Sequence, residues 1–410
     1  MSTLTPATGQ GHSTRYENIL LAVLCTSFGM VFWNRLALNY ALPFVVADLR
    51  LNNAEAGLLV SALALSWAIS GYVIGGLADR TGRRRALLVG LTLVFTFAGL
   101  ASGLASSFGA LMGMRLLMGA AQGPILPIAQ AMMASESTPA RRGLNMGLLQ
   151  NLGSGLLAYI VAPVGVVAMA VAWGWRNALM ASALPGLVLA AMIVLLVRRD
   201  PPQAAARAGL APALRYIGER NIQLCLAATV LMVMWLMVQM TFLPGYMMSQ
   251  LGFSPGEMAL QLSLRGMSGL IGGIALPALS DRFGRRRVII TGAVLAAVSP
   301  LCAALPGQTF TTLALSGLIM GAGAGCLPLV MAIVPSETAP PAAAAAAMGL
   351  IMGFGELAGG FVAPVAVGLV ADRLGPQAPF VMAGIAALLG AGLAYWLRDA
   401  TTVRIHQPAA

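Results

Sequence analysis

Charged residues are scarce in this sequence of 410 residues: they make up 9%, against 59% hydrophobic residues. Soluble globular proteins carry about 25% charged residues, so this composition excludes a soluble domain and places the chain in a lipid bilayer. Histidine occurs only twice, as His12 and His406 in the polar terminal segments, and the four cysteines show neither paired nor metal-ligand spacing. We therefore expect no metal centre, no cofactor and no Ser/His or Cys/His catalytic pair, which argues against an enzyme.

The sequence contains instead a series of apolar blocks of about 20 residues or more, the length that a helix needs to cross a hydrocarbon core of ~30 Å. The blocks are continuously apolar and do not alternate with polar residues, so they predict helices and not the strands of a membrane barrel. The expected fold class is an all-α polytopic membrane protein. We expect twelve spans, over residues 18–46, 54–79, 86–106, 108–133, 142–170, 175–197, 222–248, 255–280, 287–306, 308–334, 343–371 and 377–397.

Lysine is absent: the 24 basic residues are all arginine and outnumber the 13 acidic ones, which gives a net charge of +11. Such a charge can indicate a nucleic-acid partner. The arginines, however, cluster in alternate connections between the spans, such as residues 80–85 and 282–287. Because cytoplasmic loops are enriched in basic residues, the pattern predicts a multi-pass protein of a bacterial inner (plasma) membrane with both termini in the cytoplasm, and no nucleic-acid partner.

Internal repetition divides the chain into two halves. Gly76–Arg85 matches Ala278–Arg287 at a shift of 202 residues, and residues 162–164 match residues 363–365, both Ala-Pro-Val, at a shift of 201. Repeats with an even number of spans lie parallel in the membrane, an arrangement that suits rocking of two bundles around a midplane site. The expected organisation is a cytoplasmic tail at 1–17, six-helix bundles at 18–197 and 222–397, a cytoplasmic linker at 198–221 and a cytoplasmic tail at 398–410.

The connection between the second and third spans carries the segment Gly-x-Leu-Ala-Asp-Arg-x-Gly-Arg-Arg at residues 75–84, with a second copy at residues 279–286. On these motifs the sequence resembles the major facilitator superfamily over essentially its whole length. The resemblance implies a secondary transporter made of two six-helix bundles. Within the motifs, a carboxylate at a helix end lies beside an arginine cluster and a glycine turn, which favours gating over substrate binding. The residues concerned are Asp79, Arg83, Asp281 and Arg285.

The first and fourth spans carry a second resemblance. Residues 32–43 and 115–127 resemble the organic anion:cation symporter branch, in which the arginine equivalent to Arg35 holds a substrate carboxylate. A guanidinium presents a planar pair of donors that matches a carboxylate. The alternative for Arg35 is a structural arginine held by main-chain carbonyls or a glutamine. Proton-coupled members of the branch carry acids where this chain has Asn34 and Gln122, and neither amide can carry a proton.

Charged side chains inside a bilayer cost on the order of several kcal/mol unless they are paired or face water, so they are functional candidates. They are Arg35, Arg115, Arg265 and Glu356. We expect Arg115 to be structural and Arg265 to bind the anion together with Arg35. Glu356 is the only carboxyl expected near the midplane, which makes it the candidate for coupling or gating. The alternative is a static Arg265–Glu356 pair that stabilises the second bundle.

Three further polar residues are candidate substrate contacts: Asn39, one helical turn from Arg35, Gln122 in the fourth span and Tyr246 in the seventh. Together the patterns predict a monomeric secondary active transporter of a small organic anion, a carboxylate, that works by alternating access, with protons as a candidate coupling ion. One alternative is efflux of drugs or other hydrophobic compounds, although the positive charges expected in the cavity disfavour cations. A membrane sensor or an intramembrane enzyme is the other.

Overall fold

The computed structural model describes residues 14–81, 83–138, 141–198 and 218–398; within these ranges the side chains of residues 72–81, 150 and 341–346 are not described. The described elements are helices, and eleven stretches among them are long and apolar enough to cross a membrane. One stretch, Arg142–Leu196, has 55 residues, about twice the length of one crossing. Gly174 breaks it with φ 81° and ψ 155°. This stretch therefore contains two crossings, and the predicted twelve-helix fold class is confirmed.

The first half consists of six crossings, three of which are interrupted by short breaks or by a π-helical turn. Its elements are α1 (Thr14–Leu49), α2 (Asn53–Thr81), α3 (Arg84–Ser102), α4 (Phe108–Gln122), α5 (Ile125–Glu136), α6 (Arg142–Gly153), the π-helix η1 (Ser154–Val161), α7 (Ala162–Ala183) and α8 (Pro185–Leu196). The fourth crossing is formed by α4 and α5, and the fifth by α6, η1 and the first part of α7. The sixth crossing is the remainder of α7 with α8.

The second half repeats this plan. Its elements are α10 (Arg220–Ser249), α11 (Pro255–Phe283), α12 (Arg285–Ala304), α13 (Phe310–Ile319), α14 (Gly321–Pro328), η2 (Leu329–Ile333), α15 (Val334–Thr338), α16 (Pro341–Phe354), η3 (Gly355–Val362), α17 (Ala363–Leu374) and α18 (Ala378–Tyr395). The tenth crossing runs from α13 to α15, and the eleventh consists of α16, η3 and α17. The π-helices η1 and η3 lie at matching places, one repeat length apart.

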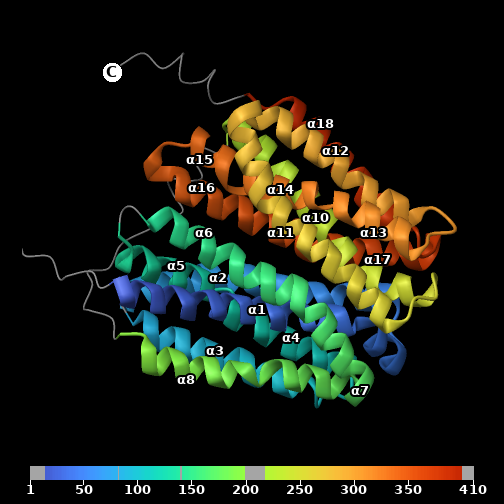
Figure 1. Ribbon diagram of the computed structural model, residues 1–410, viewed down its shortest axis with the longest axis horizontal. Coiled ribbons are helices and arrows are strands. Elements are labelled where there is room, and N and C mark those ends of the chain that lie inside the picture. The colour runs from blue at the N-terminus through green and yellow to red at the C-terminus, as the bar shows by residue number, and fades with distance from the viewer. Residues whose placement is uncertain (1–13, 82, 139–140, 199–217, 399–410) are drawn as a thin grey trace, which may run out of the picture.

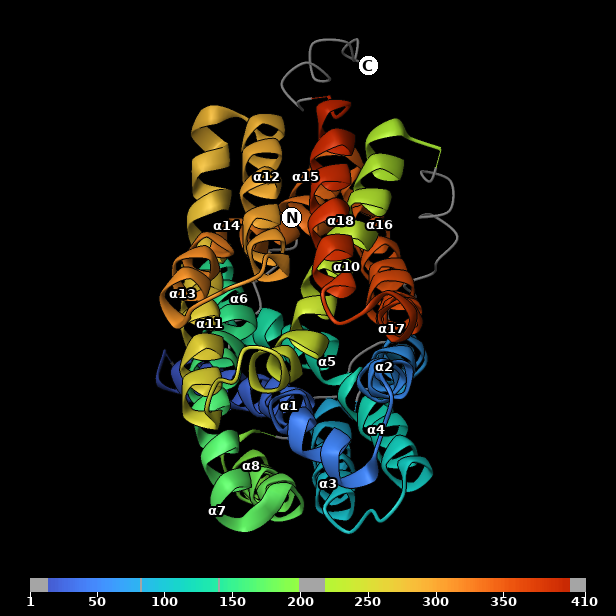
Figure 2. The ribbon, with the colours of Figure 1, turned by 90° about the vertical axis from the view of Figure 1, so that its right-hand side faces the viewer.

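The two halves form two separate bundles. In Figures 1 and 2, α1–α8 make up one bundle and α10–α18 the other, with α2 beside α17 at their interface. Large apolar side chains such as Leu104 and Leu195 are exposed on the outside, as expected of a surface that faces lipid. The expected linker falls mostly on residues 199–217, which lie outside the described ranges together with residues 1–13 and 399–410. The domain boundaries therefore stay a prediction.

Glycines bring α2 and α17 into direct backbone contact across the interface of the halves. A methyl group on Gly57 would lie 2.5 Å from the carbonyl oxygen of Pro364, and one on Gly368 would lie 2.5 Å from the carbonyl oxygen of Asn53. Real carbon atoms do not approach so closely, so a larger residue at either position would force the two helices apart. The same two helices are joined at one end by a cap.

This cap is the carboxylate of Asp372, near the end of α17. It accepts hydrogen bonds from the main-chain N–H groups of Asn53 (3.1 Å) and Ala54 (3.2 Å) and from Nδ2 of Asn53 (2.7 Å). The first N–H groups of a helix have no partner within that helix, and a carboxylate is well suited to satisfy them. A residue of the second half thus caps a helix of the first half.

A second close contact joins α11 to η1 and gives a test of the packing. A methyl group on Gly266 would lie 1.9 Å from the carbonyl oxygen of Tyr159, whereas one on Gly273, in the same helix, would meet nothing within 4 Å. We expect Gly266→Leu to destabilise the protein by about 1–3 kcal/mol, because neither backbone can yield without separating the halves. The measurement is thermal unfolding in detergent, with Gly273→Leu as the matched control. Equal melting temperatures for the two variants would contradict this packing.

Candidate functional site

An ion pair between Arg35 and Glu356 joins the two halves. Nη2 of Arg35, in α1, lies 2.9 Å from Oε2 of Glu356, in η3. The Arg35 side chain is only 8% accessible and that of Glu356 is 22% accessible. A buried guanidinium requires a counter-ion or several acceptors, because its isolated charge is costly to remove from water. Arg35 and Glu356, which are 321 positions apart in sequence, therefore neutralise each other's charge.

Aromatic rings frame this arginine. The Cζ atom of Arg35 lies 4.9 Å from the ring centroid of Trp67, in α2, and 5.6 Å from that of Phe32, one turn earlier in α1. The Phe32 ring is 5.9 Å from Trp67 and 6.1 Å from Tyr159, in η1. Tyr159 lies within electrostatic reach of both Arg35 and Glu356. The negative faces of such rings attract a guanidinium, so they help to hold Arg35 in place.

Sequence reasoning missed Phe32 and Trp67 as parts of this site. The position of Phe32, three residues before Arg35, was a usable signal, since residues at this spacing lie on one helix face. Trp67 offers no local signal, because it belongs to a different helix. Tyr159 lies in the π-helix η1, with its ring centroid 6.1 Å from that of Phe32.

Proline accounts for the π-helices η1 and η3. Pro163 and Pro364 lack an N–H and so cannot donate to the carbonyls of Tyr159 and Gly360, four residues earlier. At each place the preceding alanine donates five residues back instead: the N–H of residue 162 to the carbonyl of residue 157, and that of 363 to the carbonyl of 358. The wider turns shift the side chains that precede them, and such turns are frequent at functional sites.

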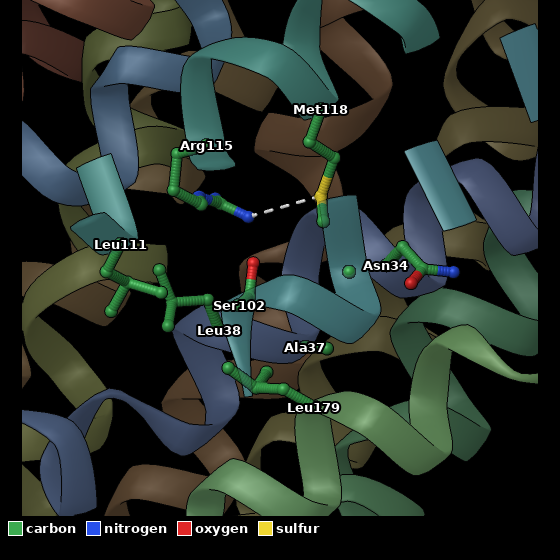
Figure 3. Close-up of a pocket in the computed structure, with 9 residues that line it drawn as sticks. Asn34, Ala37, Leu38, Ser102, Leu111, Arg115, Met118 and Leu179 are labelled. Atoms are coloured by element: carbon green, nitrogen blue, oxygen red, sulfur yellow. Dashed lines mark hydrogen bonds between the residues drawn. The ribbon is translucent and has the colours of Figure 1, made fainter. Parts of the chain in front are cut away.

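Arg115 holds the main chain of Arg35. Its Nη1 donates to the carbonyl oxygen of Arg35 at 3.1 Å and lies 3.9 Å from the sulfur of Met118. Beside it is a small cavity, with room for about one water molecule, that Asn34 and Ser102 help to line (Figure 3). Asn34 donates to the carbonyl oxygen of its own helix four residues earlier. Arg115 thus supports the main chain of Arg35 and takes no part in the Arg35–Glu356 ion pair.

Arg265 does not pair with Glu356, in contrast to one alternative from the sequence. Its Nη1 donates to Oγ of Ser299 at 2.6 Å and lies 3.6 Å from the sulfur of Met320, while its Nη2 donates to the carbonyl oxygen of Leu313 at 3.4 Å. These partners belong to α12, to α13 and to the residue that follows α13. Arg265 is therefore held within the second bundle, and Glu356 takes the arginine of the other bundle.

Arg115 and Arg265 occupy corresponding places in the two bundles. At the repeat shift of 202 residues, Arg115 corresponds to Gly317 and Met118 to Met320. Arg265 lies against Gly317: a methyl group there would be 2.9 Å from its Cγ. A guanidinium therefore lies at this place in each bundle, but it comes from α4 in the first bundle and from α11 in the second. This explains why Arg265 is turned away from the interface.

The other candidate contacts fall into different surroundings. Asn39 reaches across the interface, where its Nδ2 donates to the carbonyl oxygen of Met240 at 3.4 Å. Gln122 is fully buried, and its amide has no hydrogen-bond partner among the described residues. Tyr246 lies near the end of α10, with its ring centroid 4.7 Å from that of Phe380. Asn39 is therefore the member of this group that lies between the halves, where α1 meets α10.

The candidate gating residues lie at the ends of α2 and α11. Arg285 forms ion pairs with Asp281, at 2.6 Å, and with Glu337, at 2.8 Å. The second motif copy is thereby tied to α15. In the first copy Arg83 is exposed just before α3, and Asp79 lies outside the residues whose side chains are described.

Comparison with known proteins places this geometry in a wider context. A family model described as Major Facilitator Superfamily matches residues 20–242 and 224–410. The chain is 28% identical to the "Probable sulfoacetate transporter SauU" of Cupriavidus necator over 92% of both chains. It is 25% identical to the "Hexuronate transporter" of Bacillus subtilis, over 86% of this chain and 88% of that one. With the "Probable 4-methylmuconolactone transporter" of Cupriavidus pinatubonensis it shares 27% identity, over 82% and 80%.

Partial matches and solved structures complete the comparison. The "Multidrug export protein EmrB" of Haemophilus influenzae is 28% identical, but over only 38% of this chain and 30% of that protein. A bacterial homologue of the human lysosomal transporter Spinster, in an inward-facing and occupied conformation, superposes with a TM-score of 0.83 at 16% identity and covers 97% of this chain and 100% of its own. At this identity the likeness shows a shared fold.

A double-mutant cycle tests the ion pair. Arg35→Leu or Glu356→Leu alone leaves a charge without its partner, and we expect each to cost on the order of 2 kcal/mol, less than the ~3–5 kcal/mol of fully buried pairs because Glu356 is partly accessible. The double variant should recover most of that loss. Combining Glu356→Leu with Arg265→Met serves as the control and should give additive losses, since these residues do not touch. Unfolding in detergent measures all five variants, and coupling to Arg265 instead of Arg35 would refute the pairing.

Proposed function

The chain belongs to the major facilitator superfamily, and we propose that it is a secondary active transporter that carries a small organic anion with a carboxylate group by alternating access. The observation that carries this proposal is the Arg35–Glu356 pair between the bundles. The carboxylate of Glu356 occupies the place that a substrate carboxylate would take. An arginine that already binds one carboxylate at a partly accessible interface is prepared to exchange it for another.

The names of the similar proteins support an anionic substrate. Sulfoacetate and hexuronate, which name two of them, are both carboxylates, and these relatives match the chain over most of its length. The match to a multidrug export protein covers less than half of the chain. Arg35 lies at the interface between the bundles, and Arg115 and Arg265 add positive charge within them, which disfavours the export of hydrophobic cations.

Exchange of partners at Arg35 also gives a route for coupling. When the substrate carboxylate takes the guanidinium, Glu356 loses its counter-ion in surroundings of low polarity, and a proton neutralises it. The carrier then moves the anion and one proton together. Asn34 and Gln122 cannot carry the proton, because a side-chain amide does not gain or lose a proton near neutral pH. The proposed coupling ion is thus the proton, carried by Glu356.

Orientation follows from the arginine-rich connections. We infer an inner-membrane location with both termini in the cytoplasm, which puts the Asp372 cap on the outer side. This cap and the α2–α17 contact then hold the outer side closed. The solved structure with the TM-score of 0.83 is inward-facing, which supports an inward-facing conformation here. The Arg285–Asp281–Glu337 cluster then lies at the cytoplasmic side, where a gate is required.

Arg35→Lys tests the anion site. A lysine keeps the charge but offers no planar pair of donors, so we expect a carboxylate substrate to bind at least tenfold more weakly. Arg176→Lys is the matched control, because Arg176 pairs with Asp48 and is 39% accessible. The measurement is counterflow of a labelled organic acid in proteoliposomes. Unchanged affinity in Arg35→Lys would contradict a bidentate contact.

Glu356→Gln tests the coupling. We expect this variant to lose uptake driven by a pH gradient but to retain counterflow, because exchange of one anion for another needs no net proton movement. Both assays use the same proteoliposomes, so a folding defect would show as a loss of both. Gradient-driven uptake at the wild-type rate would exclude Glu356 as the proton carrier.

A further inference from the structure

We propose that the carried anion has a flat, unsaturated or aromatic body with few hydroxyl groups. This inference rests on the proposed function, since it concerns the part of the substrate that lies next to the carboxylate bound by Arg35. Arg35 would accept the carboxylate of a flat unsaturated acid and that of a sugar acid equally well, so the body of the acid decides between them. The surroundings of the ion pair, and not the pair itself, carry the inference.

Three aromatic rings lie around Arg35, which would hold the substrate carboxylate. Phe32, Trp67 and Tyr159 come from three different segments, and each is partly accessible instead of sealed in the core. The ring centroid of Phe32 lies 5.9 Å from that of Trp67 and 6.1 Å from that of Tyr159. Ring faces offer stacking to a flat apolar body, and they offer no hydrogen bonds to hydroxyl groups.

The wall beside Glu356 is bare. A methyl group on Gly360 would lie 2.9 Å from Oε2 of Glu356 and 3.5 Å from Cβ of Ala64. Neither glycine nor alanine carries a polar side-chain atom. The Glu356 carboxylate is therefore closely packed against Gly360 on this side, which leaves the side of the aromatic rings for the body of the substrate.

Polar side chains of the neighbouring turns are already engaged. Asn34 donates to the carbonyl of Met30, Thr241 to that of Met237 and Gln239 to that of Trp235. The groups with no partner among the described residues include the amide oxygen of Asn39, the indole N–H of Trp33 and the hydroxyl of Thr229, and these three atoms are buried. They can serve only a few polar substituents.

A sugar acid brings several hydroxyls, and most of them would lose water at this site without gaining a partner. Each such hydroxyl is expected to weaken binding by roughly tenfold. A flat unsaturated acid loses little on the same transfer and gains stacking against the rings, worth about three- to tenfold in affinity per well-placed ring. We therefore expect the site to bind a flat unsaturated acid much more tightly than a sugar acid.

The test compares matched acids on the full-length protein in proteoliposomes. Benzoate, cyclohexanecarboxylate, glucuronate and acetate are each used to compete with counterflow of labelled benzoate and labelled acetate. We expect benzoate to compete at least tenfold better than glucuronate and several-fold better than its non-planar analogue, cyclohexanecarboxylate. If glucuronate competes as well as benzoate or better, this inference is overturned, but the proposed function as an anion carrier is not. If none of the four acids binds or exchanges, the proposed function itself fails.

Variants of Trp67 separate recognition from folding. Trp67→Leu should lower the affinity for benzoate about three- to tenfold more than the affinity for acetate, and Trp67→Phe should restore benzoate, because only a ring face is required. Trp173→Leu, at an exposed position, is the matched control. Equal losses for benzoate and acetate in Trp67→Leu, with no rescue by phenylalanine, would show that the ring only supports the fold and would overturn its role in recognition.

Discussion

A guanidinium that is removed from water must be paired, and in this protein the partner of Arg35 comes from the other half of the chain. The Arg35–Glu356 contact of 2.9 Å is therefore more than a local interaction. It requires that η3 of the second bundle lie against α1 and α2 of the first. Loss of either partner would destabilise the protein, because the remaining charge would then be buried without a counter-ion. The arrangement of the two bundles at this contact follows from that constraint.

The rest of the interface is built so that this contact can form. Pro163 and Pro364 impose a π-helix at the same level in each bundle, and these π-helices contain Tyr159 and Glu356. Glycine at position 266 lets α11 approach the carbonyl of Tyr159 directly. Small residues and prolines, which by themselves bind nothing, thus decide where the few polar groups lie.

The sequence predicted the twelve crossings and the two-fold repeat, because continuous apolar blocks and repeated motifs are local features. It also identified Arg35 and Glu356, since intramembrane charges stand out in a chain with so few. It could not predict that these two pair, because contact across 321 positions leaves no local pattern. The role of Arg265 was obscured for the same reason: only the structure shows that Gly317 makes room for it inside its own bundle.

The cap that Asp372 places on α2 has a kinetic consequence. Its three hydrogen bonds are exposed, so water can replace each of them as it breaks. Each bond then contributes only about 1 kcal/mol net, and the two halves can separate there stepwise without a large activation barrier. Domain motions of this kind proceed within microseconds to milliseconds. A cap that water can replace bond by bond can thus join α17 to α2 and still release it quickly.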